Sequence, residues 1–230
     1  MLCSNLKFKY CNGIVVGCAL VAASVSFGAG YTIFNGVAQC LHEELSNISA
    51  ATNFTEEIHK FGDLNYFNAL LSMYYWGQPL SIPLMVVVAS CFSMKAGMIL
   101  LLLVAAGISL YPLWLCLGME LVLTARAVEG AVDSMMTALM LQYANELCPK
   151  NSGLFMGIIL SGLSLGAMLG SLMSGCFCSL TGWPLGFYWT VGIKLIPFPL
   201  LLLGKSSDQD SPNTPTGKQS ILAQCASMVK

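Results

Sequence analysis

Three charged residues, Arg126, Glu129 and Asp133, lie close together within an otherwise apolar stretch of the chain. An ionisable side chain at bilayer depth costs roughly 2.5–3.5 kcal/mol on insertion scales, so charges in membrane spans are rare and by default functional. Arg126, Gly130 and Asp133 have the spacing of one helical face. Glu129 lies beside that face, three residues after Arg126 and four before Asp133. We expect this face to meet other helices or a water-filled path rather than lipid.

A fourth charge, Lys194, interrupts a later apolar stretch. A lysine at that depth needs a carboxylate partner or a cavity. Glu129 and Asp133 are both candidate partners, and the sequence does not choose between them. We predict that the four charges lie on the pathway of a transported solute or ion. The alternative is an internal salt bridge that locks the helices together, although transporters also make and break such pairs as they change state.

The composition predicts an all-α, polytopic membrane protein. Of the 230 residues, 56% are hydrophobic and only 9% are charged, with a mean hydropathy of +0.73, whereas a soluble domain carries about 25% charged residues. The net charge of −1 and the lack of a basic patch argue against nucleic acid as a partner. The sequence has no Ser-His-Asp set, phosphate loop or metal-ligand cluster, so neither an enzyme nor a cofactor or metal is predicted. The ten cysteines are interpreted as small apolar packing residues.

Six apolar stretches are each long enough to cross a bilayer, which takes about 20 residues. The expected transmembrane helices are residues 13–39, 66–89, 96–117, 118–144, 153–177 and 185–203. They form one bundle over residues 13–203, preceded by a short cytoplasmic N-terminus (1–12) and followed by a polar tail (204–230) that is expected to be disordered.

The loop over residues 40–65 is polar and acidic and carries two glycosylation sequons, at Asn47 and Asn53. Sequons are used on the lumenal or extracellular side of a membrane. With the N-terminus inside, Lys60 is outside and the other lysines of the loops and tails face the cytoplasm, as the positive-inside rule requires. Both signals therefore predict that the N- and C-termini are cytoplasmic.

Regularly spaced glycines mark the stretch 153–177 as a helix that packs closely. Gly162, Gly166 and Gly170 recur every fourth residue and Gly175 follows, a pattern that gives a smooth groove for a neighbouring helix. Gly130 is expected to play the same part in the charged helix. In the stretch 66–89, two prolines at membrane depth predict a kink.

The run Arg126-x-x-x-Gly130-x-x-Asp133 resembles the helix 4 signature of the anion:cation symporter branch of the major facilitator superfamily, where the last residue is Glu. That branch includes sialin, the vesicular glutamate transporters and the type I sodium–phosphate cotransporters. The sequon-bearing loop is also similar, and so is Gly182-Trp183-Pro184, followed by Phe187-Tyr188, at the start of the last stretch. Departures are the loop between the second and third stretches, which keeps little beyond Lys95, and the absence of an arginine from residues 13–39.

The resemblance implies a secondary active transporter of an organic or inorganic anion, coupled to H⁺ or Na⁺, in a plasma, lysosomal or vesicular membrane. It implies that Arg126 attracts the anion or pairs with an acid, and that Asp133, with Glu129 as a second candidate, carries the coupling proton or ion. Relatives have twelve spans in two halves, and this sequence corresponds to the first half. The alternative is therefore a truncated half-transporter that moves nothing and acts as a membrane interaction partner or has no independent activity. A homodimer that rebuilds the pathway from two copies is a third option.

Overall fold

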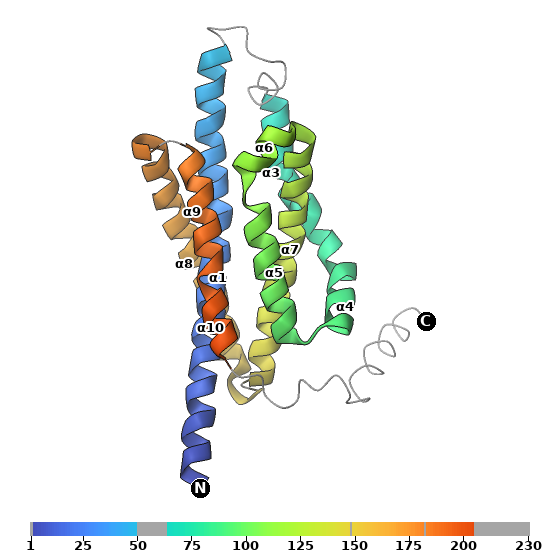
Figure 1. Cartoon of the computed structure of the whole chain (residues 1–230), viewed down its shortest axis with the longest axis vertical. Helices are drawn as coiled ribbons and strands as arrows, with labels where there is room; N and C mark the ends of the chain where they lie inside the picture. Colours follow the sequence, from blue (N-terminus) through green and yellow to red (C-terminus); the bar gives the residue numbers. More distant parts are fainter. Residues whose placement is uncertain (1, 50–63, 148, 182, 205–230) are drawn as a thin grey trace.

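The computed structural model describes residues 2–49, 64–147, 149–181 and 183–204, which are almost entirely helical and contain no strand. The helices form an elongated bundle and run roughly along its long axis (Figure 1). Within these ranges, three helices are long and apolar enough to cross a membrane, namely Gly13–Glu43, Ser152–Ser179 and Pro184–Leu203. A bent pair of helices is a candidate fourth span. The all-α membrane fold is thus confirmed, while the number of six spans stays a prediction.

The first helix, α1 (Leu2–Ser49), is longer at both ends than the expected span 13–39. The prediction that a loop begins at residue 40 is wrong. No glycine or proline interrupts residues 38–49, and leucine and glutamate there favour a helix. Gln39 also donates to Glu43 one turn later, at 3.3 Å. Asn53 and the side chain of Asn47 lie outside the described residues, so the two glycosylation sites stay predictions.

The second expected span is divided into α3 (Leu64–Gly77), η1 (Gln78–Leu80) and α4 (Ser81–Cys91). Pro79 lies in the 3₁₀ turn η1 and Pro83 in the first turn of α4. Proline lacks the N–H that continues an α-helical ladder, so the break falls where the two prolines predicted a kink.

The third expected span, 96–117, is two helices rather than one. α5 (Met94–Ile108) and α6 (Tyr111–Leu117) meet at an angle of 56°. Pro112 occupies the first turn of α6, where its missing N–H would have no helical partner in any case. The indole Nε1 of Trp114 donates to the carbonyl of Ile108 at 3.0 Å and so satisfies a backbone group freed by the break.

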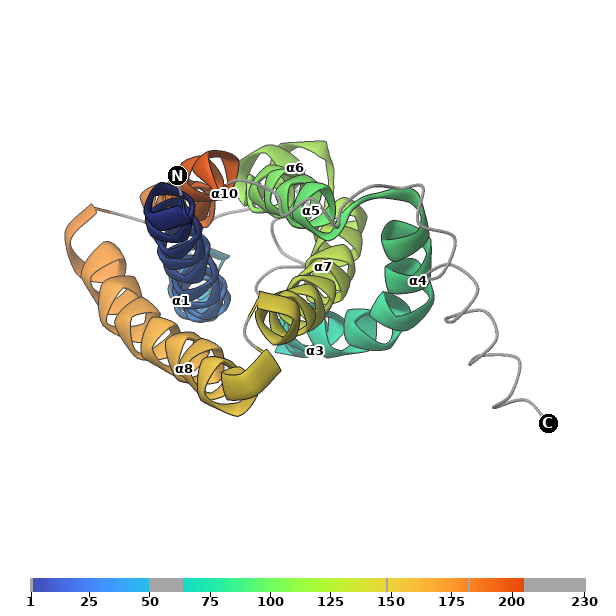
Figure 2. The same ribbon diagram turned by 90° about the horizontal axis from the view of Figure 1, so that it is seen from below.

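The charged stretch forms one long helix, α7 (Met119–Leu147). A short turn η2 (Pro149–Asn151) leads to α8 (Ser152–Cys176), which continues into the wider turn η3 (Phe177–Thr181). The last expected span is α9 (Trp183–Leu195) and α10 (Pro197–Leu203), interrupted where Pro197 begins a new helix. From below, α1 lies between α8 and the α9–α10 pair, and α7 lies between α3 and α5 (Figure 2).

The backbone of α8 touches the backbone of α1 at its glycines. A Cβ atom added to Gly166 would lie 2.1 Å from the carbonyl oxygen of Val25, and one added to Gly170 would lie 2.5 Å from that of Ala29. Gly162 is equally close to the Ser24 hydroxyl. Gly175 differs, because a Cβ there would meet no atom within 4 Å. The prediction that Gly175 takes part in this packing is therefore wrong: its position on α8 no longer faces α1.

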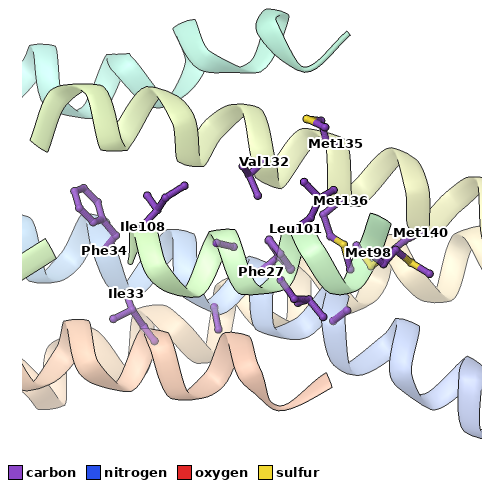
Figure 3. Close-up of a cluster of buried hydrophobic side chains, with 14 of the residues drawn as sticks. Phe27, Ile33, Phe34, Met98, Leu101, Ile108, Val132, Met135, Met136 and Met140 are labelled. Atoms are coloured by element: carbon purple, nitrogen blue, oxygen red, sulfur yellow. The ribbon is translucent and has the colours of Figure 1, made fainter. Parts of the chain in front are cut away.

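The apolar core lies where α1, α5 and α7 meet (Figure 3). Its buried side chains include Phe27, Phe34, Met98, Leu101, Val132, Met136 and Met140. Large apolar residues also cover much of the outside, with Leu172 64% and Leu203 75% exposed. A surface of that kind is stable against lipid and not against water.

A disulfide joins Cys40, near the end of α1, to Cys178 in η3, with a Cα–Cα distance of 6.0 Å. The interpretation of the cysteines as packing residues is wrong for this pair. The two residues are 138 positions apart and come together only because α8 packs along α1.

Candidate functional site

The four predicted charges form one cluster at the centre of the bundle. Arg126, Glu129 and Asp133 project from α7 toward the other helices, and Lys194 reaches them from α9. Arg126, Glu129 and Lys194 are 0% exposed and Asp133 is 5% exposed. Two cations therefore face two carboxylates, and the formal charges of the cluster cancel.

Glu129 is the centre of this cluster. Arg126 Nη1 lies 2.5 Å from Glu129 Oε2, and Lys194 Nζ lies 2.5 Å from Glu129 Oε1. The Tyr111 hydroxyl of α6 donates to Oε2 at 2.5 Å, and the Ser109 hydroxyl donates to Oε1 at 3.5 Å. Oε2 thus has one cationic and one neutral donor, whereas Oε1 depends on Lys194, because the Ser109 hydroxyl shares its one proton with the closer Ala105 carbonyl, at 2.8 Å.

Arg126 is enclosed by α1 and α3 as well as by its own helix. Its Nη2 donates to Asn35 Oδ1 at 2.8 Å. Its Cζ lies 3.7 Å from the centre of the Phe34 ring and 4.6 Å from that of Tyr74, distances typical of cation–π contacts. Its Nε has no hydrogen-bond partner. The guanidinium therefore has aromatic faces on two sides, and its Nε–H is an unused donor.

Asp133 is held less tightly than Glu129. The Tyr74 hydroxyl donates to Asp133 Oδ2 at 3.1 Å. Oδ1 has no hydrogen bond and lies 3.8 Å from Lys194 Nζ. Asp133 is also the member of the charged cluster that lines a cleft of about 610 Å³ between α1, α3, α7 and α8. Other polar residues of this cleft are Tyr31, Tyr74, Gln78, Ser134, Thr137 and Ser164.

A second cleft, of about 370 Å³, is lined by none of the four charged residues and touches the cluster through a neutral one. It lies between α1, α3 and α8 and includes Asn35, the hydrogen-bond partner of Arg126. Tyr31 lines both clefts, and its hydroxyl is hydrogen-bonded to that of Tyr75. Tyr31 therefore lies where the two clefts approach each other, and Asp133 lines the larger one.

The whole-chain comparison fits this arrangement of buried charges in an apolar helical bundle. Residues 14–227 match the family model of the Major Facilitator Superfamily. The chain belongs to the major facilitator superfamily. It is accordingly a membrane protein of the secondary-transporter class, whose members carry small solutes. A comparison with curated proteins gives no significant match.

In this major facilitator protein, the spacing of Arg126, Gly130 and Asp133 predicted a shared helical face, and all three lie toward the bundle interior. A side chain at Gly130 would clash with α3, because a Cβ there would lie 1.9 Å from the carbonyl oxygen of Tyr74. The missing side chain lets α3 approach α7 closely enough for the Tyr74 hydroxyl to reach Asp133.

Sequence reasoning missed the neutral members of the site, which are Asn35, Tyr74, Ser109 and Tyr111. Asn35 carried a usable signal, since an amide within a charge-free apolar stretch needs a partner at bilayer depth. The hydroxyl residues carried none, because serine and tyrosine are common in spans and at their ends.

Proposed function

We propose that this chain transports a small organic or inorganic anion across a membrane, coupled to H⁺ or Na⁺, as the anion:cation symporter branch does. The observation that carries the proposal is the buried cluster of Arg126, Glu129, Asp133 and Lys194. Asp133 lines the larger cleft, and Asn35, the hydrogen-bond partner of Arg126, lines the smaller one. Intramembrane charges are costly and mark substrate and ion pathways by default.

Arg126 is the residue proposed to attract the anion. A guanidinium suits this task because its planar fork binds carboxylate or phosphate with two parallel hydrogen bonds. In the described state that fork is used by Glu129 and Asn35. Asn35 lines the smaller cleft, so a solute that displaces this amide would reach Arg126 directly.

Asp133 is proposed to carry the coupling ion, with Glu129 in a supporting role. Asp133 lines the larger cleft, and its Oδ1 lacks a hydrogen bond. A proton or Na⁺ bound there would neutralise one carboxylate and leave the two cations in excess. The excess positive charge would favour an anion at Arg126, and by linkage the anion would favour the coupling ion to the same extent.

The proposed topology has six spans with both termini in the cytoplasm. The disulfide between Cys40 and Cys178 supports it, because disulfides persist in oxidising compartments. Under this topology both cysteines lie at the outer or lumenal end of the bundle, on the same side as the expected sequons at Asn47 and Asn53. The membrane would be a plasma, lysosomal or vesicular one.

The test is uptake by the purified 230-residue chain in proteoliposomes. Phosphate, glutamate and sialic acid are offered in turn under imposed proton and sodium gradients. We expect gradient-driven uptake of one of them, with loss of uptake in Arg126→Ala. Glu120→Gln is the matched control, since Glu120 is an exposed charge on the same helix. Uptake that is unchanged in Arg126→Ala, in protein shown to be inserted, would rule out the role of this residue.

A second candidate is a half-transporter that moves nothing and acts as a membrane interaction partner. The observation that favours it is the complete enclosure of Arg126 and Lys194, each 0% exposed and paired with Glu129, as expected of a structural lock. Absence of uptake from folded protein would support this candidate. A native mass measurement in detergent then distinguishes a monomer from a homodimer of two such halves.

A further inference from the structure

Lys194 occupies the position between two carboxylates that a coupling cation would need. Its Nζ lies 2.5 Å from Glu129 Oε1 and 3.8 Å from Asp133 Oδ1. Glu129 and Asp133 are four residues apart on α7, so their side chains are neighbours on the helix surface. The ammonium group bridges them from a different helix, α9, and is 0% exposed.

The neighbouring helix α1 leaves room for the lysine stem. A Cβ added to Gly30 would lie 2.7 Å from Lys194 Cε and 3.3 Å from Thr190 Cγ2. The Phe27 ring, also on α1, lies 5.5 Å from Nζ. The end of the Lys194 side chain therefore packs against α1, with a glycine opposite Cε and an aromatic ring near the ammonium.

Without the ammonium, the cluster would hold one guanidinium and two carboxylates. An uncompensated charge in a dry interior is strongly unfavourable, so the site would need another cation. Oxygen atoms suitable for Na⁺ are already present on Glu129, Asp133, Ser109 and Tyr111. A proton on Asp133 would compensate the charge equally well.

We propose that Lys194 is a tethered competitor of the coupling cation, and that it sets how tightly the Glu129–Asp133 pair binds Na⁺ or H⁺. A coupling cation takes Asp133 when Lys194 withdraws fully to Glu129, which is the closer partner in this structure. The inference rests on the proposed role of these carboxylates in coupling. Its readout is cation-dependent stability rather than transport, so the two proposals can fail separately.

The experiment measures the midpoint of thermal unfolding of the purified full chain in detergent. Na⁺ is varied against choline at constant ionic strength, and pH is varied in a separate series without Na⁺. The variants are Lys194→Met, which keeps the length of the stem but not its charge, and Lys194→Arg, which keeps the charge. The titratable groups around the ammonium are Arg126, Glu129 and Asp133 of α7, Tyr111 of α6 and Tyr74 of α3.

We expect the midpoint of Lys194→Met to rise by about 5 °C when the cation is raised well above its dissociation constant. Wild type and Lys194→Arg should respond little over the same range. A response to Na⁺ at fixed pH identifies a sodium site, and a response only to acid identifies a proton. Equal responses in Lys194→Met and wild type would overturn the proposal.

A second variant keeps the test decisive if Lys194→Met does not fold. Lys194→Met combined with Asp133→Asn has balanced charges and lacks the vacated site. Recovery of a folded, cation-insensitive protein in the double variant supports the proposal, because the missing charge is then the cause of the defect. Failure of both variants to fold shows that restoring the charge balance is not enough, so the ammonium has a structural role that no cation replaces, and overturns the proposal.

Discussion

Replacement of Glu129 by glutamine should destabilise the bundle more than almost any other single conservative change. Glutamine is nearly the same size as glutamate, so packing is retained and the charge alone is lost. The carboxylate accepts from Arg126, Lys194, Tyr111 and Ser109 in this structure. The amide that replaces one oxygen would point donor hydrogens at donors, and the two cations would share Asp133 alone.

The size of the effect follows from the burial of the partners. Breaking a fully buried ion pair by removing one side costs about 3–5 kcal/mol, because the remaining charge stays in a dry interior. Arg126 and Lys194 are both 0% exposed, so solvent screening does not reduce this figure. We therefore expect Glu129→Gln to lower the free energy of unfolding by about 3–5 kcal/mol. Lys194→Met should lower the free energy of unfolding by about the same amount, because it leaves two buried carboxylates with one cation between them.

The assay is a double-mutant cycle on these two positions, read from unfolding of the helical signal in mixed detergent micelles without Na⁺. The double variant restores charge balance, with Arg126 against Asp133. The free energy of unfolding lost in the double variant should be smaller than the sum of the losses in the two single variants by about 2 kcal/mol or more, as is found for residues of one ion-pair network. Glu120→Gln, at an exposed position in the first turn of α7, is the control and should stay within about 0.5 kcal/mol of wild type. Losses that add within about 0.5 kcal/mol would refute the cluster as one coupled unit.

Three further predictions concern the packing and the links around this cluster. Gly166→Ala should lower the free energy of unfolding by about 1–3 kcal/mol, because the added Cβ would clash with the α1 backbone. Gly175→Ala is the control and should not lower it, and thermal melts compare the two variants directly. Reduction of the disulfide between Cys40 and Cys178 should lower stability by about 2–5 kcal/mol, given the long loop that it closes, and melts with and without reductant measure this. Tyr111→Phe should cost about 1.5–3 kcal/mol by removing a donor to Glu129, and an unchanged melt would contradict that hydrogen bond.

The sequence was most informative along single helices. The spacing of Arg126, Gly130 and Asp133 is a local property, so their shared inward face followed from 3.6-residue periodicity alone. The break near Pro79 also followed from local chemistry, because proline removes a backbone donor wherever it occurs. The bend between α5 and α6 was not predicted, since residues 96–117 were expected to form one continuous helix.

Contacts between helices were the part that the sequence left undetermined. Lys194 had two candidate carboxylates, and the choice of Glu129 depends on how α9 is rotated and docked against α7. Cys40 and Cys178 looked like two of ten scattered cysteines until α1 and α8 were placed side by side. The extension of α1 to Ser49 was missed because a polar composition suggested a loop, although the local helix propensity was good.

The pairing of Glu129 with Lys194 also bears on how the protein is made. Residues enter the translocon in order, and Lys194 follows Glu129 by 65 positions. When α7 reaches the membrane, its charges at 126, 129 and 133 oppose insertion by roughly 2.5–3.5 kcal/mol each at bilayer depth. A nascent chain cut before α9 is therefore expected to leave α7 open to water-soluble thiol reagents at an introduced cysteine, and protection in that chain would contradict the idea. Stable insertion of α7 would then depend on α9, which is synthesised later, and the two helices would move from the translocon into the lipid together.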